Sequence, residues 1–61
     1  MNDNQLEGKW KQVKGNFKSK YGELTDDDTT HAEGEFDQML GRLQEKLGKT
    51  KEEIKDEIDK L

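Results

Sequence analysis

The chain has 61 residues, of which 26% are hydrophobic and 43% charged, with a formal net charge of −4 at pH 7. So short a chain forms one domain at most, over residues 1–61. It has no cysteine, and its longest apolar run is Met39-Leu40, which excludes a disulfide framework, a thiolate metal site, a membrane-spanning helix and a signal peptide, so we expect a cytoplasmic protein.

The six glycines divide most of the chain into two similar stretches. They follow one another at intervals of 7, 7, 12, 7 and 7 residues. A shift of 26 residues places residues 6–22 over residues 32–48. Identical pairs are Glu7/Glu33, Gly8/Gly34, Gln12/Gln38, Gly15/Gly41, Lys20/Lys46 and Gly22/Gly48. The sequence therefore predicts an internal duplication.

The first copy has its apolar residues at helical spacing. Its apolar positions are Leu6, Trp10, Val13, Phe17 and Tyr21, at intervals of 4, 3, 4 and 4 residues. On a helix, these positions fall within a stripe roughly 80° wide. This pattern predicts an amphipathic helix over about 3–21, ended by Gly22 in a left-handed conformation.

The second copy follows a junction rich in helix-start signals. Leu24 can fold back on the first helix, Thr25 can act as N-cap, and residues 26–28 are aspartates that suit the positive end of a helix dipole. We expect a second helix over about 26–47, ended by Gly48, although Thr29 or Thr30 is an alternative start.

The third predicted helix spans about 51–60. Thr50 and Glu53 match a capping box, and apolar residues recur at Ile54, Ile58 and Leu61. The predicted fold class is therefore all-α, a small bundle of about three helices in which the first two pair through their stripes and the third closes the bundle. The expected core is Leu6, Trp10, Val13, Phe17, Tyr21, Leu24, Phe36, Met39, Leu40, Leu43, Leu47, Ile54 and Ile58.

The glycines of each copy share the helix face opposite the apolar stripe. Either they serve as caps and permit bends, or they form a bare face on which another helix or a ligand approaches the backbone. We favour the first interpretation, since it needs no partner. The residues assigned to caps and bends are Gly15, Gly22, Thr25, Gly41, Gly48 and Thr50.

No set of residues indicates catalysis. His31 is the only histidine and Ser19 the only serine, and neither belongs to a recognisable nucleophile–base arrangement. Consecutive aspartates at 26–28 fan out around a helix, so they indicate a helix start rather than a cation site. We expect no catalytic residue, cofactor, metal or small-molecule substrate, and hence no enzyme.

Charge is distributed unevenly along the chain. Residues 1–22 have a net charge of +3 and residues 23–61 one of −7. The lysines of the first helix alternate with aromatic residues, as in helices that bind nucleic acids or anionic membranes. The aromatic residues are needed for the core, however, so we expect the lysines to pair with the acidic helices. We expect neither a nucleic acid nor an anionic membrane to be a partner.

Several stretches together resemble the CsbD-like family of small bacterial proteins, from about residue 2 to the C-terminus. They are GKWKQVKG at 8–15, GELTDDD at 22–28, Glu33-Gly34, Asp37-Gln38 and GRLQEKLG at 41–48. The resemblance implies packed α-hairpins and a general stress-response protein without an established molecular activity. Residues 30–32 are Thr-His-Ala where family members often have bulkier aliphatic residues, which lightens the core.

We therefore expect a non-catalytic stress-response protein that acts by interaction or protection. One alternative is a hydrophilin-like protectant that is partly disordered when free, which the hydrophilic composition favours. The last alternative is a basic-helix binder, in which the lysine-rich first helix binds a membrane or a nucleic acid. The residues leave the partner unknown, with a protein partner and self-association both open.

Overall fold

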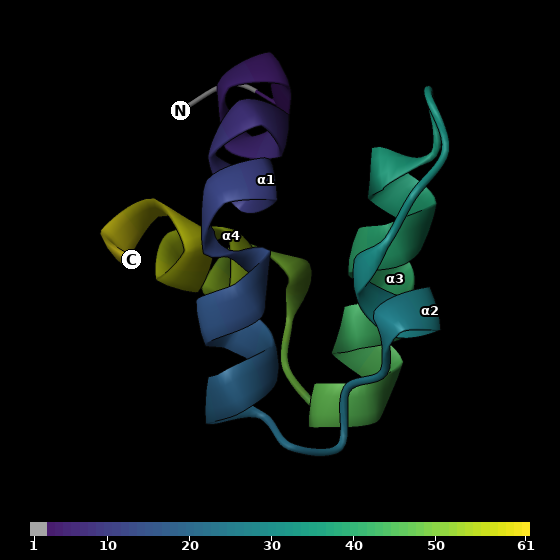
Figure 1. Cartoon of the computed structure of the whole chain (residues 1–61), viewed down its shortest axis with the longest axis vertical. Helices are drawn as coiled ribbons and strands as arrows, with labels where there is room; N and C mark the ends of the chain where they lie inside the picture. The colour runs from purple at the N-terminus through teal and green to yellow at the C-terminus, as the bar shows by residue number, and fades with distance from the viewer. Residues whose placement is uncertain (1–2) are drawn as a thin grey trace.

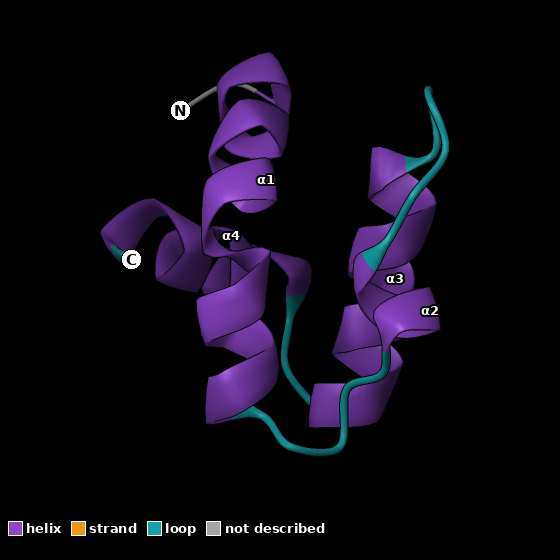
Figure 2. Ribbon diagram, viewed as in Figure 1, coloured by secondary structure: helices purple, strands orange, loops and turns teal. Residues whose placement is uncertain are grey.

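The computed structural model describes residues 3–61, and this part of the chain is all-α, with four helices and no strand (Figures 1 and 2). The helices are α1 (Asp3–Lys20), α2 (Asp26–Thr29), α3 (Phe36–Leu47) and α4 (Lys51–Lys60). The fold class predicted from the helical spacing is confirmed. Of the predicted domain, residues 1 and 2 lie outside the described part.

The first helix has one continuous turn pattern through Gly15, so this glycine does not break it. Beyond Lys20, the Tyr21 N–H still donates to the Phe17 carbonyl, and the Leu24 N–H donates to the Tyr21 carbonyl at 3.0 Å. The prediction of a left-handed Gly22 is wrong, because among the described glycines only Gly34 and Gly48 have positive φ. The turn closed by Leu24 is of a kind that ordinary backbone conformations can form.

The second predicted helix is interrupted, so its prediction as a single element over 26–47 is wrong. α2 ends at Thr29, and Thr30 is extended. In a continuous helix the Thr29 carbonyl would accept the N–H of the residue four positions later. Here it accepts the indole N–H of Trp10 instead, and Gly34 turns the chain with a φ of +82° before α3 begins. α3 then runs without a break through Gly41 to Gly48, whose φ of 65° ends it.

The last helix, α4, packs against both α1 and α3. In Figure 1 it crosses behind α1 and connects through a short loop to the lower end of α3. The main helix contacts are those of α4 with α1, α4 with α3, and α2 with α3. Direct pairing of the first two apolar stripes, which the sequence led us to expect, is therefore not the principal contact, and α4 packs against both helices instead.

The core is one cluster to which all the helices except α2 contribute apolar side chains. Trp10 and Phe17 from α1, Leu40 from α3, and Ile54 from α4 are all fully buried. Of the thirteen expected core residues, eleven are buried, and Tyr21 and Leu47 are partly buried against them. The radius of gyration is 10.3 Å, close to the roughly 10.5 Å typical of a folded chain of this length.

The two sequence copies do not share one conformation. Residues 6–9 of the first copy are helical, whereas residues 32–35 of the second form a turn. Leu6 is buried, but Ala32, which matches it after the shift, is exposed. The duplication therefore stays a prediction from sequence.

The glycines within the helices allow a stability prediction. Gly15 and Gly41 lack positive φ, and a Cβ atom at either position would meet nothing within 4 Å. Alanine favours a helix interior over glycine by about 0.8–1 kcal/mol, so Gly15→Ala and Gly41→Ala should each raise the free energy of unfolding by about that amount. Urea denaturation followed by circular dichroism measures the change, and sedimentation shows whether the oligomeric state stays the same. A loss of stability or a changed assembly would favour the bare-face interpretation.

Candidate functional site

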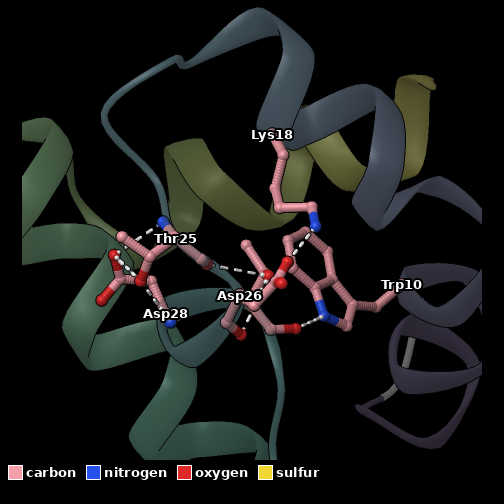
Figure 3. Close-up of polar contacts among 6 residues, drawn as sticks. Trp10, Lys18, Thr25, Asp26 and Asp28 are labelled. Atoms are coloured by element: carbon pink, nitrogen blue, oxygen red, sulfur yellow. Dashed lines mark hydrogen bonds and ion pairs between the residues drawn. The ribbon is translucent and has the colours of Figure 1, made fainter.

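The indole of Trp10 joins α1 to the end of α2. Its Nε1–H donates to the buried Thr29 carbonyl oxygen at 2.9 Å. Figure 3 marks this bond with a dashed line from the labelled indole. The indole ring also meets Phe17 edge to face, with ring centroids 5.1 Å apart, and Phe17 in turn lies 5.1 Å from Tyr21. The aromatic residues of α1 are thus occupied by the core and do not form an exposed surface.

Thr25 and Asp28 form a reciprocal cap at the start of α2. The Asp28 N–H donates to Thr25 Oγ1 at 3.3 Å, and the Thr25 N–H donates to Asp28 Oδ2 at 3.0 Å (Figure 3). Lys46 on α3 places its Nζ 2.9 Å from the same carboxylate. The Thr25 backbone hydrogen bond and then Lys46 lower the pKa of Asp28 to about 2. The acidic run at 26–28 therefore belongs to a helix cap.

The low pKa of Asp28 makes a prediction about acid stability. A carboxylate with a pKa below its ordinary 3.8 stabilises the folded state above that pH, and this contribution is lost as the pH falls toward 2. The melting temperature should therefore fall between about pH 4 and pH 2, and this fall should be smaller in Asp28→Asn. Thermal melts followed by circular dichroism from pH 2 to 7 test this. Equal acid dependence in the two proteins would contradict the assignment.

The Glu57 carboxylate on α4 contacts polar groups at the end of α1 and in the loop before α4. The Tyr21 hydroxyl donates to its carboxylate at 2.6 Å, and Lys49 and Lys20 place their Nζ atoms at 3.3 and 3.5 Å. Burial raises the pKa of Glu57, but the hydrogen bonds from Tyr21 and Lys49 outweigh it and lower the pKa overall. Burial and the Glu57 hydrogen bond raise the pKa of Tyr21. These contacts connect the end of α1 and the loop before α4 to α4 itself.

Other lysines of α1 also contact the acidic part of the chain. Lys9 donates to the Asp59 carbonyl of α4, and Lys18 pairs with Asp26 of α2. The Lys18 hydrogen bond and charge lower the pKa of Asp26. Between α4 and α3, Lys51 and Asp37 form a further pair at 3.5 Å. The basic helix is thus partly neutralised within the molecule.

His31 contacts α1 through a carboxylate. Its Nε2 lies 2.7 Å from Glu7 Oε2, and its side chain is only 7% exposed. Its ring also meets that of Phe36, with centroids 5.2 Å apart at 60°. The pairing of His31 with Glu7 could not be predicted from sequence, because Glu7 lies 24 residues away and nothing local indicates it.

The remaining groups with potential chemistry lie apart and face solvent. Ser19, Glu33 and Asp37 are exposed. Within residues 3–61, no group of three or more histidine, cysteine or acidic side chains has the arrangement needed to hold a metal ion. A surface hollow of about 620 Å³ lies between the α2–α3 connection and Arg42. Its lining includes both carboxylates and one guanidinium, so its charges do not favour a ligand of one sign. Chemically, the described surface offers charged groups that bind water and counter-ions.

No helix in the described part of the chain is long and apolar enough to cross a membrane.

Comparison with known proteins gives one consistent result. A family model described as CsbD-like matches residues 4–56. The chain is 50% identical to the UPF0337 protein ECA0631 of Pectobacterium atrosepticum, an alignment that covers 95% of this chain and 84% of the relative. It is 46% identical to the UPF0337 protein YjbJ of Escherichia coli O6:H1, covering 97% of this chain and 86% of the relative. No solved structure matches significantly.

Proposed function

This chain belongs to the CsbD-like family, which is associated with the general stress response, and we propose that it is a non-catalytic protein that works in the bacterial cytoplasm through its folded, charged surface. It acts there by interaction with other macromolecules or by their protection.

One observation carries the proposal, namely the separation of apolar from charged side chains. The core takes up nearly all the large apolar residues, and among the described residues only Leu61, at 43%, is an exposed large hydrophobic. Charged residues make up 43% of the chain. A folded protein of this kind presents a hydrated, charged surface and little apolar surface on which to aggregate.

The contacts of α1 support a partner other than a polyanion. Lys9, Lys18 and Lys20 already contact groups of α2 and α4. The whole chain has a charge of −4, which opposes binding to nucleic acids or anionic membranes. A protein partner or a second copy fits these charges better.

A protection assay tests the proposal. A labile reporter enzyme is dried and rehydrated with the wild-type chain, with an unrelated folded acidic protein at equal mass concentration, or with the Trp10→Ala variant, which should unfold. We expect the wild-type chain to preserve more reporter activity than the unrelated protein, and the variant to lose this advantage, because the folded surface is absent.

Three outcomes would contradict the proposal. Equal protection by Trp10→Ala would favour the hydrophilin-like alternative, since a disordered chain would then suffice. The wild-type chain could also protect no better than the unrelated protein and cross-link to no protein partner in stressed cells. These two results together would exclude both interaction and protection. Retention of the chain on DNA or anionic vesicles at physiological salt would favour the basic-helix alternative.

A further inference from the structure

The connection between α2 and α3, residues 30–35, runs as an extended segment along α3 (Figure 1). Thr30 and residues 32–35 are exposed, and His31 is the only residue of the segment that is not. Its backbone is closed on itself by the Glu35 N–H, which donates to the Ala32 carbonyl at 3.0 Å. Few buried contacts and an exposed backbone are the features of regions that open locally in folded proteins.

Both ends of the segment are held independently of its middle. Before it, Thr29 is buried and its carbonyl accepts the Trp10 indole N–H. Lys46 holds the neighbouring Asp28 to α3. After the segment, α3 and α1 are each packed against α4. Apart from the contact of the His31 ring with Phe36, the core cluster therefore contains no side chain of the segment.

In the described structure, one side-chain hydrogen bond, between His31 and Glu7, ties the middle of the segment to α1. The two atoms are 2.7 Å apart, and the Glu7 side chain is 30% exposed. Surface hollows of about 620 and 380 Å³ both border His31. The other residues of the segment are exposed, so His31 is the one residue that anchors its middle.

The His31 ring also covers Phe36, which is 6% exposed at the first position of α3. We propose that residues 30–35 are a latched strap: the His31–Glu7 contact holds the strap closed, and its opening exposes Phe36 while α1, α3 and α4 remain packed.

Nuclear magnetic resonance with a neutral soluble paramagnetic probe tests the strap. The chain has two phenylalanines, and Phe17, which is fully buried among the core residues, serves as an internal reference for Phe36. Glu7→Ala removes the partner of His31, whereas Glu7→Gln keeps an acceptor. Glu45→Ala is a matched control, because Glu45 is an exposed residue within a helix.

In Glu7→Ala we expect the open fraction to rise about tenfold, seen as faster probe-induced relaxation of the Phe36 ring protons. Backbone relaxation should show greater motion at residues 31–35, and Phe17 should not change. Glu7→Gln should give a smaller effect, and Glu45→Ala none. Equal gains at Phe36 and Phe17 would mean that the contact only supports global stability, and no gain at Phe36 would mean that it is no latch. Either result would overturn the proposal.

Discussion

Replacing Trp10 by alanine is expected to lower the free energy of unfolding by about 3–5 kcal/mol, enough to unfold most of a domain of this size. The side chain is fully buried, so its removal leaves a large cavity against Phe17. The Thr29 carbonyl also loses its donor. Circular dichroism and urea denaturation measure the effect, and a cooperative transition close to that of the wild type would contradict the core assignment.

Trp10→Phe separates the two contributions. It keeps most of the aromatic packing but leaves the Thr29 carbonyl without the indole donor, which costs about 1–3 kcal/mol for a buried polar group. We expect this variant to fold with reduced stability, and to show its largest amide shifts around Thr29 and Thr30. If it is as unstable as Trp10→Ala, the hydrogen bond rather than the packing dominates.

Ile54→Ala and Ile58→Ala are the second pair of strongly destabilising changes, each expected to lower the free energy of unfolding by about 2–5 kcal/mol. Both side chains are fully buried on α4, the helix that contacts both α1 and α3. Their loss should therefore loosen α1 from α3 as well as α4 from either. Urea denaturation gives the magnitude, and amide exchange shows whether protection falls in all three helices.

Asp56→Ala is the matched control on the same helix. Asp56 is exposed, so its replacement should change the free energy of unfolding by no more than about 0.5 kcal/mol. If Ile54→Ala were as mild as this control, α4 would be an appendage rather than part of the core.

The sequence predicts best what local physics decides. The spacing of Leu6, Trp10 and Phe17 marks one face of a helix, and the Thr50–Glu53 pair marks a helix start without reference to the rest of the chain. The apolar residues expected in the core lie on these stripes, which is why their burial could be anticipated. Family membership could be anticipated too, since it depends on the order of residues alone.

Tertiary contacts decided the rest. At the helix break after Thr29, the carbonyl accepts the indole N–H of a residue 19 positions earlier, and a helical pattern contains no sign of this contact. Gly34 matches Gly8 in the sequence shift, yet of these two glycines only Gly34 has positive φ. The pairing of His31 with Glu7 and of Tyr21 with Glu57 likewise follows from the packing. Charge balance indicated that lysines would meet acids, but not which ones.

The position of α4 across α1 joins the most distant parts of the chain. Lys9 contacts the backbone of Asp59, 50 positions later, and Tyr21 contacts the side chain of Glu57, 36 positions later. An up-and-down helical bundle of this length closes mainly through neighbours in sequence, and such local topologies fold fastest. Here the first and last helices must meet before the core is complete, so much of the entropy of loop closure is lost at once. We therefore expect this small helical protein to fold more slowly than its length and helix content would suggest.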